Sequence, residues 1–453
     1  MNEMLSTITD TVRSDRDRIF RQLSELVGFN SVHDEPGIGD DPARAADWVA
    51  DAFAAVGLEI EKIDTDDGST LIQGSRVVDK HAPTVLLYAH HDVVPAGDPR
   101  AWSANPFTLT ERDGRWYGRG AADCKGNVIM HLAALRAAEV AGGPKVNVTA
   151  IIEGSEERGG EGLSALVEKR PELFAADAIL IADTGNRAVG TPTLTTSLRG
   201  GAQVTVTVGT LRAPVHSGML GGPAPDAVAA LVRLLDSLRD DSGNTVIDGV
   251  DTSATWEGAD YVEETFRADA GVLDGVELFG AEGDSPADLV WARPTVTVTG
   301  FSSTPVSEAV NAVPATASAQ LNLRVPHPMS ARKTVEKLVA HLKQHIPWGA
   351  HLNIEVSDIN EPFATATDVP ATQHLSACLA QAYDEKETVQ IGAGGSIPLA
   401  ATLQAAQPQA TIALFGVEEP KCAIHSPDES VDPTEIENIA IAEALFLTSY
   451  QPK

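Results

Sequence analysis

The chain has 453 residues, of which 43% are hydrophobic and 21% charged, so the composition is that of a soluble globular protein and the length predicts two domains. Its 33 basic and 64 acidic residues give a formal net charge of −31, which repels phosphate backbones and anionic lipid surfaces and argues against nucleic acid or membrane partners. Residues 1–20 have no signal-peptide pattern and the three cysteines form no disulfide framework, so we expect a cytoplasmic protein.

The first part of the chain alternates helix and strand patterns. Apolar residues recur at helical spacing in three segments: 10–27, 42–56 and 127–140. Short apolar runs rich in β-branched residues predict three buried strands, at 84–89, 146–152 and 178–182, and residues 58–63 are predicted to form a further strand. This alternation, which continues to about residue 198, predicts an α/β fold with a mostly parallel sheet covered by helices.

The pattern changes after residue 198. Polar and apolar residues alternate with period two in 202–208, 295–299 and 317–325, which is typical of half-buried antiparallel strands. Helical patterns follow at 225–238 and 331–345, and a strand pattern at 351–356. We therefore predict an α+β domain over residues 199–362, inserted into an α/β domain made of residues 1–198 and 363–453.

Two further segments complete the predicted elements. A helix over residues 373–383 and a strand over 410–415 return the chain to the α/β domain. The stretch 240–288 is acidic, irregular and rich in glycine, and we expect it to be a surface excursion without chemistry.

Side chains that can bind metals follow the predicted strands. His90 comes directly after 84–89, Asp183 after 178–182, and the pair Glu156 and Glu157 soon after 146–152, while His425 lies in the loop beyond 410–415. Sites in open α/β sheets lie outside the carboxyl ends of the strands, so the sequence predicts that these side chains meet.

The spacing of these residues along the sequence predicts different roles for several of them. His90 and Asp92 face the same side of an extended chain, so the carboxylate can hold the second ring nitrogen of the histidine. Asp123, in a turn with three glycines, can bridge two cations, although it also stands where a helix N-cap would. Glu156 and Glu157 point in different directions, so one can bind metal while the other acts as a base.

The predicted ligands are His90, Asp123, Glu157, Asp183 and His425. Mixed nitrogen and oxygen ligation suits zinc, with manganese or cobalt as substitutes. Five ligands exceed the needs of one open catalytic zinc, and with one bridging carboxylate they suit two metals about 3.5–4 Å apart. The sequence therefore predicts a metal-dependent enzyme.

The sequence motifs that contain these residues, taken in order, resemble those of the M20 family of co-catalytic metallopeptidases, and within it the dipeptidase and carnosinase-like branch. The motifs are HxD, GRGxxDxKG, EGxEExGG and AxHSP, and the resemblance covers nearly the whole chain. It implies a zinc-binding α/β catalytic domain interrupted by an α+β lid that also forms a homodimer.

The resemblance also implies roles for the predicted site residues. One metal would be held by His90 and Asp183, and the other by Glu157 and His425. Asp123 would bridge the two metals. Asp92 would orient His90, and Glu156 would be the general base and acid.

Further sequence motifs match positions that bind substrate in this family. The resemblance implies that His216, in APVHSGMLGG, stabilises the reaction oxyanion, and that in a dimer it can come from the partner subunit. It implies that Asn311 and Arg324 grip the substrate and that Gly395 and Ser396 help to bind its carboxylate. From the residues alone, His216 could equally be a loop histidine, Arg324 a charge on a strand surface, and 394–398 a simple turn.

The expected reaction is hydrolysis of the amide bond of a dipeptide with a free carboxylate, by a metal-bridging water whose proton Glu156 takes. Cys124 stands where many carnosinase-like proteins have a second Asp, and residues 92–95 read DVVP where that branch often has DVQP. An N-acyl-amino-acid deacylase of the aminoacylase or desuccinylase type is therefore the alternative. A non-catalytic binding protein with the same fold is a more distant one.

Overall fold

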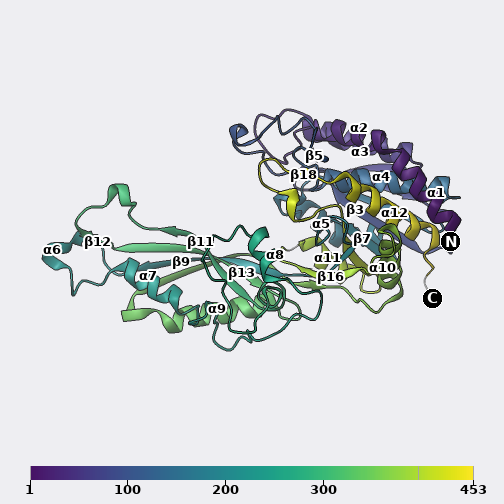
Figure 1. Ribbon diagram of the computed structural model, residues 1–453. Coiled ribbons are helices and arrows are strands. Elements are labelled where there is room, and N and C mark those ends of the chain that lie inside the picture. Colours follow the sequence, from purple (N-terminus) through teal and green to yellow (C-terminus); the bar gives the residue numbers. More distant parts are fainter. Residues whose placement is uncertain (1, 396, 452–453) are drawn as a thin grey trace. The chain divides into compact units, whose positions relative to one another are not determined.

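The structure is a computed structural model that describes residues 2–395 and 397–451, and it divides into two compact units. Unit 1 comprises Met1–Thr196, Thr365–Ile391 and Pro398–Lys453, and unit 2 comprises Ser197–Ala364 and Gly392–Ile397 (Figure 1). Among the described helices, none has the length and apolar character that a membrane span requires.

Unit 1 is built on a mixed sheet with the strand order β1-β2-β6-β3-β7-β17-β8. Its strands have the following bounds: β1 Glu59–Asp64, β2 Thr70–Arg76, β3 Thr84–His90, β6 Asn147–Glu153, β7 Ala178–Ala182, β8 Thr193–Leu198, β16 Val389–Ala393 and β17 Thr411–Phe415. The four central strands β6, β3, β7 and β17 are parallel to one another. Their carboxyl ends therefore lie at the same edge of the sheet.

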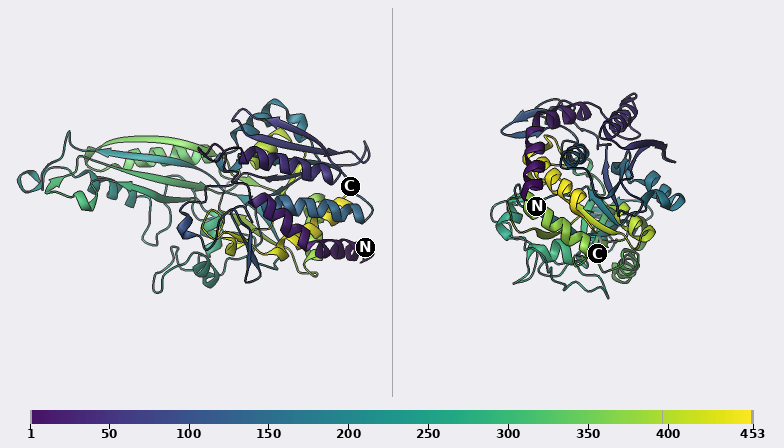
Figure 2. Two further views of the ribbon diagram at one scale, coloured as in Figure 1. Left: turned by 90° about the horizontal axis from the view of Figure 1, so that it is seen from above. Right: turned by 90° about the vertical axis from the view of Figure 1, so that its right-hand side faces the viewer.

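The helices of unit 1 pack on a sheet that is buried on both faces. They have the following bounds: α1 Asn2–Ser14, α2 Arg16–Val27, α3 Asp41–Ala55, α4 Lys125–Val140, α5 Glu161–Lys169, α10 Pro370–Ala382, α11 Pro398–Ala406 and α12 Pro433–Ser449. Val85 and Leu87 of β3 join the main core, whereas Leu86 and Tyr88 are buried on the opposite face. The yellow C-terminal helix α12 lies beside the purple helix α1, so the two ends of the chain share this core (Figure 2).

The predicted helix over residues 10–27 is two helices, α1 and α2. The chain breaks at Asp15, whose carboxylate accepts a hydrogen bond from Arg136 Nε of α4 at 2.7 Å. Asp is unfavourable in a helix interior and common at a helix start, and Asp15 stands at the N-cap position of α2. A small separate sheet of three strands completes unit 1: β4 Thr110–Arg112, β5 Arg115–Tyr117 and β18 Ser430–Val431.

Unit 2 contains a four-stranded antiparallel sheet with the order β11-β13-β9-β14. Its strands and helices have the following bounds: β9 Gly200–Gly209, β10 Val215–His216, β11 Thr295–Ser302, β12 Ala312–Val313, β13 Thr316–Val325, β14 His351–Asn360, β15 Phe363–Ala364, α6 Ser217–Leu220, α7 Ala227–Asp236, α8 Glu263–Asp269 and α9 Ala331–His345. Alternate residues of β9 and β13, such as Val204 and Leu321, form a core with Leu231 of α7 and Leu338 of α9. The two helices cover one face of this sheet, and the other face is polar.

The short segment Gly392–Ile397 belongs to unit 2, although the sequence placed all of 363–453 in the α/β domain. Arg199 N donates to Ala393 O at 3.2 Å, and a Cβ on Gly392 would lie 2.7 Å from Trp291 Cγ. A glycine-rich segment has no hydrophobic periodicity, so the sequence carries no signal for this packing.

Candidate metal centre

The carboxyl ends of the parallel strands deliver most of the predicted ligands to one place. His90 is the last residue of β3, Asp183 follows β7, and Glu157 lies in the turn that follows β6. Asp123 stands two residues before α4, and His425 lies in the loop between β17 and α12. The structure thus brings together all five residues that the sequence predicted as metal ligands.

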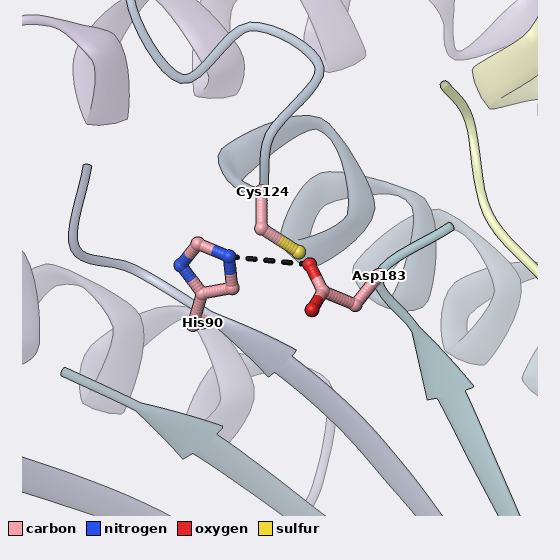
Figure 3. Close-up of side chains that lie close together, drawn as sticks. All are labelled: His90, Cys124 and Asp183. Carbon is pink, nitrogen blue, oxygen red and sulfur yellow. Dashed lines mark ion pairs between the residues drawn. The ribbon is translucent and has the colours of Figure 1, made fainter. Parts of the chain in front are cut away.

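These five side chains form two groups that share Asp123. His90 Nε2 lies 3.1 Å from Asp123 Oδ1 and 3.2 Å from Asp183 Oδ1, the second contact being drawn in Figure 3. His425 Nε2 lies 3.0 Å from Asp123 Oδ2 and 3.1 Å from Glu157 Oε2. Asp123 therefore turns one carboxylate oxygen toward each histidine, which is the arrangement that a bridging ligand needs.

The electrostatics of the two groups fit cations. Hydrogen bonds with Asp123 and Glu157 raise the pKa of His425 to about 10. Burial raises the pKa of Glu157 to about 7 and also raises the pKa of Asp183. Carboxylates outnumber histidines here, so positive charge is needed for all of them to ionise, and divalent metals with oxygen and nitrogen ligands would supply it.

Asp92 links the end of β3 to the turn that carries the glutamate pair. Its Oδ1 lies 3.3 Å from His90 Nδ1 and accepts the backbone N–H of Glu156 at 3.1 Å, while its Oδ2 accepts the N–H of Glu157 at 3.0 Å. One carboxylate therefore positions a histidine of one group and a glutamate of the other.

Glu156 lies beside the ligands but makes no ion pair with the two histidines. Burial, followed by the negative charge of Asp183, raises the pKa of Glu156 well above its ordinary value. A carboxyl group whose pKa is raised can both take up and release a proton, as a general base and acid must.

Two acidic residues of this centre were missed by the sequence reasoning. An oxygen of Glu418 lies within 4.8 Å of oxygens of Asp123 and Asp183, and burial raises its pKa well above the ordinary value. Glu418 follows β17, so the rule that found Asp183 would have found it too.

The second of these residues, Glu429, is fully buried and holds the loop that carries Asp123. Its carboxylate accepts the backbone N–H groups of Gly120, Ala122 and Asp123 at 3.1 to 3.2 Å, and it pairs with Arg119 Nη1 at 2.6 Å. No spacing rule links Glu429 to these partners, which lie about 300 residues earlier in the chain.

Cys124 also faces the first group (Figure 3). Its thiol is buried, donates to Ala182 O at 3.1 Å and lies within 4.8 Å of the ligand atoms of His90 and Asp183. Burial raises the pKa of Cys124 far above that of a free thiol, so the side chain is neutral in this environment.

The remaining predicted residues lie in unit 2 and do not all come together. His216 is exposed at the end of β10, next to β12, and Ser217 N donates to Asn311 O at 2.8 Å, so His216 and Asn311 are neighbours. Arg324 lies near the other end of β13, Gly395 is exposed, and Ser396 lies outside the described residues.

Within one chain, the length of β13 separates His216 and Asn311 from Arg324. Asn311 precedes the strand, which begins at Thr316, and Arg324 is its penultimate residue. At about 3.3 Å per residue, the part of the strand between them spans roughly 26 Å, far more than the length of a dipeptide.

Comparison with known proteins adds independent evidence. The family model described as peptidase family M20/M25/M40 matches residues 86–449. A cysteinylglycine-S-conjugate dipeptidase of Corynebacterium striatum is 52% identical over 99% of both chains, and a Cys-Gly metallodipeptidase of Schizosaccharomyces pombe is 29% identical over 76% of both. The crystal structure of human carnosine dipeptidase 1 has a TM-score of 0.81 at 24% identity and 98% coverage of both chains. The predicted fold class, an α/β domain with an inserted α+β domain, is confirmed.

Proposed function

The chain belongs to peptidase family M20/M25/M40 and is a metallodipeptidase, and we propose that it hydrolyses dipeptides of the Cys-Gly type with two divalent metal ions. The observation that carries the proposal is the pair of ligand groups that share the two oxygens of Asp123. The substrate class rests on the relative that matches the chain along its whole length, and the dipeptidases among the relatives favour this activity over that of an N-acyl-amino-acid deacylase.

We assign the ligands by these groups. His90 and Asp183 would hold one metal, Glu157 and His425 the other, and Asp123 would bridge them. Zinc suits this set, with manganese or cobalt as alternatives. When bound, the metals polarise the scissile carbonyl and lower the pKa of the attacking water.

Glu156 is the residue that moves the proton. It takes a proton from the attacking water and passes it to the leaving amine, as its raised pKa permits. Asp92 holds the backbone of Glu156 in place through the hydrogen bond to its N–H. His216 donates to the oxyanion, and Asn311 helps to grip the substrate.

The substrate carboxylate is bound by Arg324, since a guanidinium can donate to both carboxylate oxygens. Gly395 and Ser396 are proposed as further residues that bind this carboxylate. A substrate held by Arg324 lies too far along β13 to reach His216 of the same chain. We therefore propose a homodimer formed through unit 2, in which His216 and Asn311 of one subunit complete the site of the other. Three unpaired cysteines support a cytoplasmic location.

Hydrolysis of a substrate panel by zinc- or manganese-loaded protein tests this function. The panel contains Cys-Gly, an S-substituted Cys-Gly, β-Ala-His, N-acetyl amino acids and N-succinyl amino acids, and mass spectrometry identifies the products. We expect cleavage of the free dipeptides, with the Cys-Gly compounds preferred, and about two metal ions per chain by elemental analysis. Cleavage confined to the acylated compounds would instead assign a deacylase.

Substitution of Glu156 tests the mechanism separately from metal binding. We expect Glu156→Gln and Glu156→Ala to keep both metals and to lower kcat by about 10²–10⁴-fold, because the proton acceptor is lost. Elemental analysis and steady-state kinetics on the same samples measure both quantities. Full activity in a metal-loaded variant would contradict the assignment of the base.

A further inference from the structure

The polar face of the sheet in unit 2 carries two neighbouring arginines. Thr295 of β11 is paired directly with Arg324 of β13, so their side chains point to the same face of the sheet. Arg199, which immediately precedes β9, donates from Nη1 to Thr295 Oγ1 at 3.2 Å. Both guanidinium groups therefore lie at the same end of this face.

Neither arginine has an acidic partner among the described residues. Arg324 donates from Nε to the amide oxygen of Asn322 at 3.1 Å, and Nε of Arg199 is buried without a hydrogen-bond partner in the described structure. Burial and then the positive charge of Arg324 lower the pKa of Arg199 to about 10. Without a bound anion, the positive charges of these two guanidinium groups therefore repel each other.

The lack of an acidic partner for Arg199 and Arg324 is unusual in a chain with an excess of acidic residues. The chain has 64 acidic residues, and Arg293 in the same unit pairs with Asp284 at 2.8 Å. A buried guanidinium normally has its donors satisfied, because an unpaired buried charge is costly. The cost at Arg199 is explained if a ligand supplies the missing anion.

The space beside Arg199 is open to a ligand. Arg199 lines a cavity of about 1130 Å³ in unit 2, whose lining also includes Thr295 and acidic residues such as Asp284 but not Arg324. A Cβ on Gly394 would lie 3.2 Å from Arg199 Nη2, so the glycine at this position keeps the approach to the Arg199 guanidinium open.

We propose that Arg199 is a second carboxylate-binding residue, which shares the terminal carboxylate of the dipeptide with Arg324. This inference rests on the proposed function, and it adds to it a residue that sets specificity for a free carboxylate. Each guanidinium donates to the bound carboxylate, whose negative charge offsets the repulsion between the two arginines.

The test compares an S-substituted Cys-Gly with its C-terminal amide as substrates for the metal-loaded enzyme and its variants. For the free acid, we expect Arg199→Met to lower kcat/KM by about 10–100-fold, mostly through KM, because a hydrogen bond to a charged group is lost. The amide should be cleaved as well as by the wild type, so that the preference for the acid falls. Arg324→Met should act in the same way, and Arg233→Met, a change at an exposed arginine of α7, should have no effect.

Thermal unfolding distinguishes substrate binding from a structural role. The metal-loaded Arg199→Met variant should unfold at the wild-type temperature or up to about 2 °C higher, because a repulsive buried charge has been removed. Acetate, the simplest carboxylate, should raise the Tm of the wild type more than that of the variant. A lower Tm with an unchanged acid-to-amide preference would overturn the inference.

The two proposals fail in different ways. A wild-type enzyme that cleaves neither dipeptide nor dipeptide amide contradicts the proposed function, while the acetate experiment still tests the anion site. A wild-type enzyme that cleaves acid and amide equally well is a dipeptidase without carboxylate recognition, which contradicts the carboxylate-binding roles of both arginines. A preference for the acid that falls in Arg324→Met and stays unchanged in Arg199→Met contradicts the role of Arg199 alone.

Discussion

Glu153 ends strand β6 beside His90 of β3, and its carboxyl group is buried although it belongs to neither ligand group. Its backbone carbonyl accepts the N–H of His91 at 2.8 Å, and its Oε2 accepts the hydroxyl of Tyr88 at 2.6 Å. Burial raises the pKa of Glu153 to about 8. The folded protein therefore keeps a proton on this residue at pH values where an unfolded chain has lost it.

This proton makes stability depend on pH. The folded pKa lies above the ordinary value of 4.5, so the contribution to stability is complete below about pH 4.5 and is lost as the pH rises through about 8. Glu153→Gln imitates the protonated form, so the variant should gain stability relative to the wild type between pH 5 and 9. The gain should be on the order of a few kcal/mol, since each tenfold change in the proton affinity of the carboxyl group is worth about 1.4 kcal/mol.

Thermal unfolding at pH 5, 7 and 9 in the presence of a chelator measures this gain. Glu111→Gln, at an exposed residue of β4, is the matched control and should follow the wild type at every pH. If Glu153→Gln has the same pH dependence as the wild type, the buried carboxyl is not the group that titrates.

At the level of residues, much of the candidate metal centre could be predicted, because several of its ligands stand at the ends of predicted strands. His90 and Asp183 follow apolar runs that can only be buried strands, and parallel strands end at one edge of a sheet. Arg199 carries no comparable signal, because what marks it is the lack of an acidic partner within ion-pair distance among the described residues. Only coordinates show which arginines of a chain have such a partner.

Among the elements, the loop before α4 is held by a residue from the other end of the chain. Glu429 accepts three backbone N–H groups of this loop and pairs with Arg119. Glu429→Gln should destabilise the protein by about 3–5 kcal/mol, because the buried guanidinium of Arg119 loses its counter-charge. It should also weaken metal binding, since Asp123 is part of the loop.

Chemical unfolding and metal titration measure these two effects. Asp428→Asn is the matched control. Asp428 pairs with Arg112 at 3.5 Å near the surface, and the backbone N–H of Ser103 that it accepts at 2.8 Å can still be accepted by the amide oxygen of Asn, so the loss of its charge should change the stability by less than about 1 kcal/mol. Unchanged metal affinity in Glu429→Gln would show that the loop keeps Asp123 in place without this carboxylate.

Elements with strong periodicity were predicted closely, and those set by tertiary contacts were not. Strand β7 has the predicted bounds, because a buried run between polar residues leaves little choice of register. Asp15, at the break between α1 and α2, bonds Arg136 of another helix, and Gly392 packs against Trp291. Interactions between distant segments leave no local pattern to read.

At the level of the whole molecule, the proposed dimer can be tested by complementation. His216→Ala and Glu156→Gln are each expected to be nearly inactive. After subunit exchange in equal amounts, about half of the dimers are mixed, and each has one site with both residues intact, so roughly a quarter of the wild-type activity should return. Native mass spectrometry verifies the mixed dimers. If they form and activity stays absent, His216 acts within its own chain.

The proposed dimer implies that a single chain is inactive, because β13 keeps a substrate held by Arg324 away from His216 of the same chain. A newly made chain would then fold and bind its substrate, yet it would lack the donor to the oxyanion until it met a second copy. In that case assembly would play the role that removal of a propeptide plays in secreted proteases. Specific activity should therefore fall when the protein is diluted below the dissociation constant of the dimer. At such low concentrations a newly synthesised chain would not hydrolyse dipeptides.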